Sequence, residues 1–124
     1  MMLKLGSTTR PWHLWSFDQA CKSIAHAGYK EVSIYSHEGK IPVNSESSPS
    51  EIAEISAIMK KYELVPSMVL GSPRLELSVD DAVADYKKLV DATAAVGCKW
   101  LMNGGVGEEP LYEKFLEIMR QTSV

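Results

Sequence analysis

The sequence has little positive charge and no long hydrophobic run. Its 124 residues include 13 Lys and Arg against 16 Asp and Glu, and no basic run is longer than the pairs at 60–61 and 87–88. Without a basic surplus, binding to the phosphate backbone of nucleic acids is disfavoured. No apolar stretch approaches the roughly 20 residues that are needed to cross a bilayer. Polar residues soon follow the first methionines, whereas a secretory signal peptide has an apolar segment there. We therefore expect a soluble, cytoplasmic protein that binds neither nucleic acid nor membranes.

Cysteine is also scarce, with only Cys21 and Cys98. The two lie far apart among residues typical of a protein core, and neither has the spacing of a metal ligand. We therefore expect buried free thiols rather than a disulfide. By contrast, hydrophobic residues make up 45% of the chain and charged residues 23%. That composition is sufficient to bury a core, and the length predicts a single domain over residues 1–124.

Four short apolar segments have the character of buried strands, and they recur at a spacing of about 30 residues, close to one βα unit of a barrel. They span residues 3–7, 31–36, 64–70 and 99–102. In the third segment, Pro66 fits near the beginning of the strand, because in mid-strand it would remove a hydrogen bond of the ladder.

A segment with helical spacing follows each strand. Ser16 with Gln19 and Ser48 with Glu51 have the pattern of capping boxes, and a fourth helix is expected from Pro110 onward. The third helix begins at Ser78 and ends before the glycine at 97. Its expected inward side comprises Ala82, Val83, Tyr86, Leu89, Val90 and Thr93.

The strict alternation of strand and helix predicts an α/β protein with a parallel sheet and right-handed crossovers. The patterns alone fit either a barrel or an open, doubly wound sheet. A complete barrel of eight units takes roughly 250 residues, so four βα units would form half of a (β/α)8 TIM barrel. The chain ends at residues 121–124 without a capping signal, as a truncated barrel would.

Four stretches of the sequence carry a family resemblance: "LKLGSTT", "DQACKSIAHAGYKEVSIYSHE", "MKKYELVPSMV" and "YKKLVDATAAVGCKWLMNGG". They resemble the first four βα units of the sugar phosphate isomerase/epimerase family, the xylose-isomerase-like TIM barrels, and so only the amino-terminal half of such a barrel. The most specific pieces are the corners at 27–29 and 95–98, where a helix gives way to a strand. These corners mark the fold and not a catalytic motif.

The resemblance implies metal-dependent isomerisation or epimerisation of a sugar in the full-length form. A divalent cation such as Mg²⁺ or Mn²⁺ would be held by acidic residues and a histidine, and it would stabilise an enediolate. In the family these ligands lie on strands five to eight, beyond residue 124. We therefore assign no metal ligand, no catalytic residue and no cofactor to this chain, and we leave open whether it is an enzyme by itself.

If the barrel forms, the loops after each strand carry the residues that contact the substrate. The predicted substrate-binding residues are Arg10 and Trp12 after the first strand, His37 and Glu38 after the second, and Asn103 after the fourth. His37 could donate to a sugar hydroxyl or move a proton, but we favour a solvated loop histidine. Trp12 could stack on a sugar ring or belong to a hydrophobic lid that packs onto the protein.

Three glycines, Gly104, Gly105 and Gly107, precede the fourth helix and raise the question of a phosphate site. Backbone N–H groups at a helix start can bind phosphate. Barrels, however, usually bind phosphate after strands seven and eight, and Glu108 and Glu109 would repel an anion. We favour a backbone corner at this position.

Three functions follow from these observations. The leading one is the amino-terminal half of a sugar isomerase or epimerase. The second is a half-barrel that works by pairing, either with itself or with a separate second half, because unpaired parallel edges favour association. The third is a non-catalytic binding module of flavodoxin-like layout, although the first βα turn has no G-x-G-x-x-G loop. The acidic balance disfavours the DNA-repair endonucleases of the same superfamily.

Overall fold

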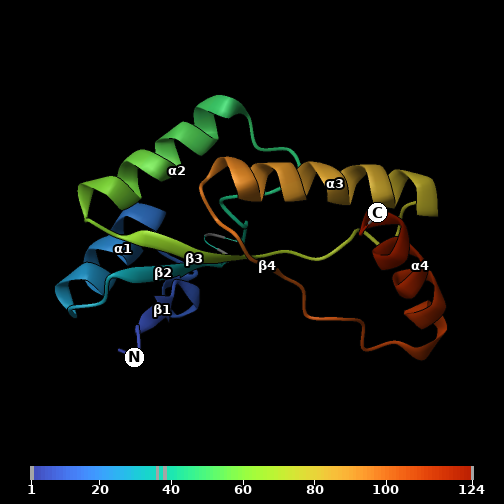
Figure 1. Ribbon diagram of the computed structural model, residues 1–124, viewed down its shortest axis with the longest axis horizontal. Helices are drawn as coiled ribbons and strands as arrows, with labels where there is room; N and C mark the ends of the chain where they lie inside the picture. Colours follow the sequence, from blue (N-terminus) through green and yellow to red (C-terminus); the bar gives the residue numbers. More distant parts are fainter. Residues whose placement is uncertain (1, 36, 38, 124) are drawn as a thin grey trace.

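The structure of the chain is a computed structural model, and it describes residues 2–35, 37 and 39–123. Four strands alternate with four helices along the chain (Figure 1). The strands are β1 (Gly6–Thr8), β2 (Glu31–Ile34), β3 (Val65–Leu70) and β4 (Leu101–Met102). The helices are α1 (Phe17–His26), α2 (Pro49–Lys61), α3 (Val79–Ala95) and α4 (Tyr112–Thr122), with short 3-10 helices η1 (Arg10–Trp12) and η2 (Glu109–Leu111).

The strands form one parallel sheet in the order β1-β2-β3-β4. This confirms the predicted α/β class, and the sequential order is the one that four consecutive units of a TIM barrel have. Pro66 is the second residue of β3, close to the predicted place. There the pairing register shifts, because Val32 lies opposite Pro66 whereas the next residue of β2, Ser33, lies opposite Met68.

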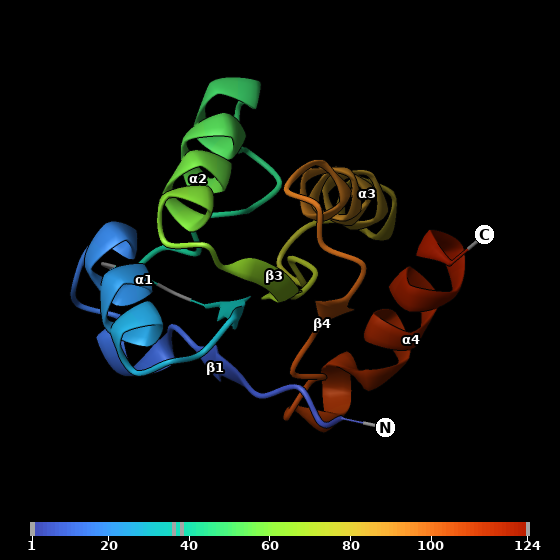
Figure 2. The same ribbon diagram turned by 60° about the vertical axis from the view of Figure 1, so that its left-hand side comes forward.

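Helices α1, α2 and α3 lie in an arc on one side of the sheet (Figure 2). The main core lies between them and the sheet, with Ile24, Val32, Ile34 and Val69 fully buried there. A smaller cluster joins α3 to α4. Among the described residues, no helix covers the opposite face of the sheet. None of these helices combines the length and the apolar character that crossing a bilayer requires.

Local signals correctly identify the starts of the first two helices. Ser16 and Ser48 each accept a hydrogen bond from the backbone N–H three residues on, at 3.2 Å, and Gln19 and Glu51 return it. Both predicted thiols are buried and free, and burial raises the pKa of Cys21 to about 12. Cys21 therefore stays protonated, as a core residue does.

Several predicted boundaries and one predicted face are wrong. β2 ends at Ile34 and β4 begins at Leu101, so both strands are shorter than predicted. The first strand begins at Gly6 rather than at residue 3, because its neighbour β2 begins at Glu31, the partner of Gly6. A turn of 3-10 helix containing Pro110 precedes α4, which begins only at Tyr112. Val90 is 41% exposed. Val83 lies in the cluster with Ile118 of α4, whereas Val90, two turns further along, lies outside it.

Candidate functional site

The loops that follow the parallel strands lie together at the carboxyl ends of the strands, and we call this end of the sheet the rim. Thr9, directly after β1, is fully buried and joins the first two strands there. Its backbone N–H donates to the carbonyl of Ser33 at 3.0 Å, and its Oγ1 accepts the N–H of Tyr35 at 2.8 Å. Since its N–H and its hydroxyl bind β2 and the residue directly after it, Thr9 fixes the place where the first loop begins.

Arg10 lies on the rim with its guanidinium over the Tyr35 ring, 5.3 Å from the ring centre. A guanidinium in this position is attracted by the ring but keeps its N–H donors available at the edge. Trp12 is half-buried and packs against the main core. Of the two roles expected for Trp12, the packing favours the lid over an open stacking platform.

His37 is only 5% exposed, so the expectation of a solvated loop histidine is wrong. Its Nδ1 lies 3.1 Å from the carbonyl oxygen of Trp15, and its ring meets the ring of Phe17 edge-on at 5.4 Å. His37 thereby ties the loop after β2 to the start of α1. Its predicted neighbour Glu38 lies outside the described residues.

Asn103 lies at the other end of the rim, after β4. Its Nδ2 donates to the hydroxyl of Tyr86 at 3.4 Å and lies 3.6 Å from the sulfur of Met119. Its Oδ1 accepts the N–H of Gly105 at 3.0 Å, and Gly105 has a φ of 71°, a value that glycine adopts without strain. The side chain thus shapes the glycine-rich turn, as expected of a backbone corner.

A cleft of about 290 Å³ lies between the two middle loops of the rim and α3, and we call it the rim cleft. Asp85 of α3 and Arg74 of the loop after β3 both line it, together with Ser45 and Gly71. The Oγ of Ser45 donates to Asp85 at 2.8 Å. A carboxylate that accepts and a guanidinium that donates are the groups that orient a polyhydroxylated ligand.

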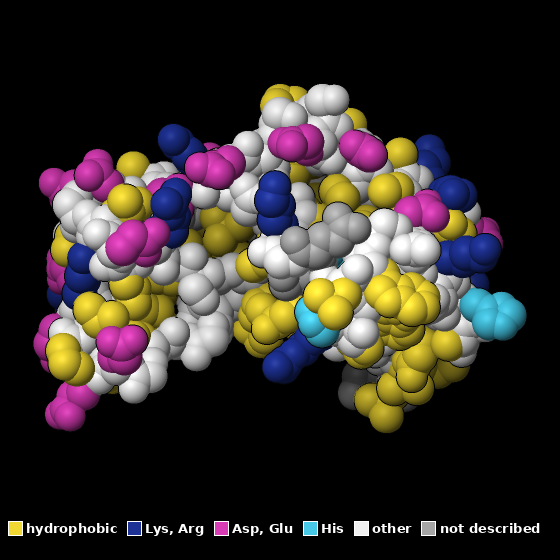
Figure 3. Space-filling view, turned by 180° about the vertical axis from the view of Figure 1, so that it is seen from behind, with side chains coloured by type: hydrophobic (Ala, Val, Ile, Leu, Met, Phe, Trp, Pro, Cys, Tyr) yellow, Lys and Arg dark blue, Asp and Glu magenta, His cyan; other side chains and the backbone are white. Residues whose placement is uncertain are grey.

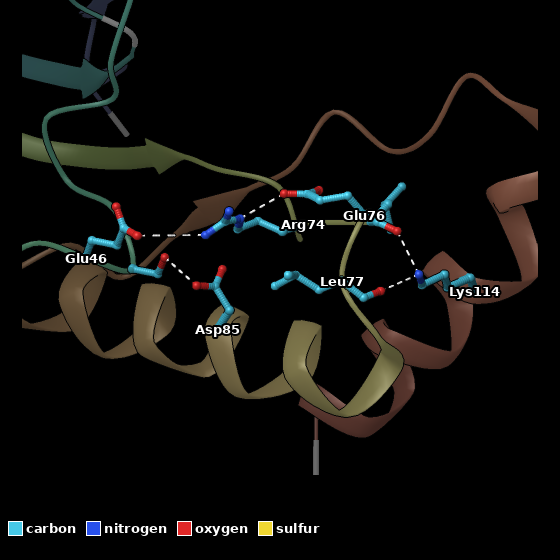
Figure 4. A network of polar contacts seen from close by, with 8 residues as sticks. Glu46, Arg74, Glu76, Leu77, Asp85 and Lys114 are labelled. Carbon is cyan, nitrogen blue, oxygen red and sulfur yellow. Dashed lines mark hydrogen bonds and ion pairs between the residues drawn. The ribbon is translucent and has the colours of Figure 1, made fainter.

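Arg74, which lines this cleft, forms two ion pairs (Figure 4). Arg74 lies 2.9 Å from Glu76 and 3.8 Å from Glu46, and the hydrogen bond with Glu76 raises the pKa of its guanidinium. The pKa of Glu76 lies below its usual range, first because its own backbone N–H donates to it and then because of Arg74. From α4, Lys114 donates to the carbonyls of Leu75 and Leu77. The loop after β3 is therefore held from both sides.

The sequence-predicted residues are divided between two places. Arg10, Trp12 and His37 lie in the loops after β1 and β2, whereas Asn103 lies against α3 and α4. Ser45 and Asp85 were missed as site residues. Asp85 lies within a helix and Ser45 in a long loop, so no local motif distinguishes either one. Arg74 carries a recognisable signal, because a charged residue soon after a strand of a parallel sheet lies at the rim.

The implied divalent metal can be tested against the donor set. Within the part of the chain that the structure describes, no three His, Cys, Asp or Glu side chains lie close enough together to hold a metal ion. Asp85 has a serine and an arginine nearby rather than further carboxylates. The described residues therefore do not fit a metal of this kind, and we derive no step through one.

The sheet order and the arc of helices together define a parallel α/β fold of the half-barrel type. A crystal structure of D-psicose 3-epimerase in the presence of D-fructose is similar to this chain, with a TM-score of 0.62 and 15% sequence identity. The match covers 82% of this chain and 37% of that chain, so the chain spans little more than a third of the length of that epimerase. At this identity the likeness shows the fold. No protein-family model and no curated protein sequence matches the chain.

Proposed function

We propose that the chain is the substrate-contacting half of a sugar isomerase or epimerase of the TIM-barrel type. The observation that carries this proposal is the rim cleft, a polar cleft of about 290 Å³ at the carboxyl ends of parallel strands. In barrels of parallel strands, the carboxyl ends of the strands form the face that binds substrates. The fold likeness to an epimerase whose structure was determined with D-fructose supports the choice of a sugar.

The proposed contacts fall into two groups. In the rim cleft, Asp85 accepts and Arg74 donates hydrogen bonds to sugar hydroxyls, which carry both donors and acceptors. Arg10 and Trp12 cover the neighbouring part of the rim, and the predicted contacts of His37, Glu38 and Asn103 belong to the same proposal. Because His37 and Asn103 already hold their loops, their contribution to binding acts mainly through loop position.

Titration of the ¹⁵N-labelled chain with D-fructose and D-psicose, followed by amide chemical shifts, tests this proposal. We expect the shifts to concentrate at residues 9–13, 44–46, 71–74 and 103–105. Asp85→Asn keeps the shape and the acceptor for Ser45 but removes the charge, so it should weaken binding about tenfold, the worth of one charged hydrogen bond. Asp91→Asn, on the exposed side of the same helix, is the matched control.

Two results would contradict the proposal. One is the absence of any concentrated shift at saturating sugar, or shifts confined to the outer faces of the helices. The other is an equal loss of affinity in Asp85→Asn and Asp91→Asn, since only the first residue lines the rim cleft. Aldose–ketose turnover by this chain with added Mn²⁺ would contradict the separate conclusion that its described residues do not fit the metal.

A further inference from the structure

The face of the sheet that points away from the helices carries exposed apolar side chains. Leu101 packs toward the core, so alternation along the strand turns its neighbours Trp100 and Met102 to the other face, where they are 73% and 47% exposed. Val65, which follows the buried Leu64, is 59% exposed. Parallel sheets are normally covered on both faces, so this face requires a cover.

The total exposed surface is too large for a compact monomer. The chain exposes 8103 Å² and has a mass of 13.7 kDa, for which a compact monomeric protein exposes about 6,600 Å². The excess of about 1,500 Å² per chain falls within the range that permanent dimers bury per subunit. Figure 3 shows apolar side chains gathered on the half of the molecule that carries β1 and α1, where Leu3 and Leu5 are exposed.

Both edges of the sheet offer backbone groups for a further parallel strand. In β1, Thr9 bonds to β2, so alternation directs the N–H groups of Gly6 and Thr8 to the outer side. In β4, the carbonyls of Trp100 and Met102 bond to β3, so the polar groups of Leu101 point outward. Among the described residues, no strand pairs with either outer side.

We propose that two copies of this chain close into one eight-stranded barrel, with β4 of each copy pairing in parallel with β1 of its partner. A two-fold axis parallel to the barrel axis places β4 of each copy beside β1 of the other, in parallel. No edge strand is then left unpaired. Eight strands is the number at which side chains just fill a barrel interior. Val65, Trp100 and Met102 of both copies then meet inside.

The second copy is the occupant that the edges favour, because the cover must supply one parallel strand to β1 and another to β4 at the same time. A second copy presents both edges with the right polarity. In the closed barrel the two rims form one mouth, so each rim cleft faces the loops of the partner and a site at that mouth is incomplete in one copy. The pairing does not depend on sugar binding.

Sedimentation equilibrium of the whole chain tests this arrangement. We expect a mass twice the 13.7 kDa of one chain. Met102→Asp places a charge on the inner face and should give a monomer. Thr8→Pro removes an outward N–H and should weaken the dimer through the backbone. Val90→Asp is the matched control, because Val90 is exposed to a similar degree on a helix outside the pairing edges, and this variant should stay dimeric.

Circular dichroism shows whether each variant remains folded. A folded wild type that stays monomeric up to about 100 μM would overturn the proposal, because even a dimer with a Kd of about 1 μM is largely paired at that concentration. So would open-ended oligomers, since a closed barrel stops at two copies. A dimer that withstands both Met102→Asp and Thr8→Pro would show that another surface forms it. The sugar titration of the wild type separates the pairing from the proposed function. A wild-type dimer without shifts at the rim cleft would contradict the proposed function alone, and a wild-type monomer with shifts there would contradict the pairing alone.

Discussion

Gly71 follows β3 and lines the rim cleft beside Leu89. A Cβ at this position would lie 2.5 Å from Cδ2 of Leu89, which is buried. Gly71→Ala should therefore destabilise the chain by about 1 kcal/mol, near the lower end for overpacking, because the obstructing atom is the tip of a leucine. Urea unfolding measures the change.

Two controls make this prediction specific. A Cβ at Gly104 would meet no atom within 4 Å, so Gly104→Ala should leave the free energy of unfolding nearly unchanged. Adding Leu89→Val to Gly71→Ala should recover part of the loss if the contact with Leu89 causes it. Equal destabilisation by the two glycine variants would contradict the steric explanation.

The residues chosen for their chemistry differ in what their polar groups already do. His37 and Asn103 use theirs to hold loops and do not line the rim cleft. Arg74 and Asp85 also have protein partners, but both side chains line the rim cleft. Arg74 follows a strand, as His37 and Asn103 do, and Asp85 lies within α3, so position in the sequence does not separate the two kinds. Burial and hydrogen-bond partners do, and for this reason the experiments on ligand binding concentrate on Asp85.

Among the helices, α2 has the most complete start. Ser48 is its N-cap, Pro49 occupies the first helical position and Glu51 returns the hydrogen bond at 2.7 Å, which is the largest cause of the lowered pKa of Glu51. Ser48→Ala removes the side-chain acceptor and should destabilise the chain by about 1 kcal/mol, as loss of such a cap does.

Thermal unfolding measures the effect of Ser48→Ala. Ser50→Ala is the matched control, because Ser50 is exposed in the first turn and is not the cap. Its midpoint should stay close to that of the wild type. If Ser48→Ala and Ser50→Ala behaved alike, the capping box would contribute no stability of its own.

For the whole molecule, the proposed barrel links stability to concentration. A dimer that forms only from folded chains gains stability by mass action, so its unfolding midpoint should rise as the chain concentration rises. Differential scanning calorimetry over a hundredfold range of concentration measures this shift. In Met102→Asp, which should not pair, the midpoint should be independent of concentration, and a constant midpoint in the wild type would speak against pairing.

Much of the fold was predictable because its signals are local. The strand and helix order, the capping boxes at Ser16 and Ser48 and the place of Pro66 near a strand start depend on residues a few positions apart. The errors concern tertiary neighbours. The beginning of β1 depends on where β2 offers a partner, and the exposure of Val90 depends on how far α4 reaches along α3.

The candidate site was less predictable for the same physical reason. The sequence by itself determined the alternation of strand and helix. It therefore also determined that polar loops such as the one with Arg74 gather at the carboxyl ends of parallel strands. Only the tertiary structure decided that Ser45 meets Asp85 across 40 residues, and that His37 is buried against Phe17. Those contacts depend on sheet register and helix packing. These bring together side chains that are far apart in the sequence, and no local motif around them predicts the contact.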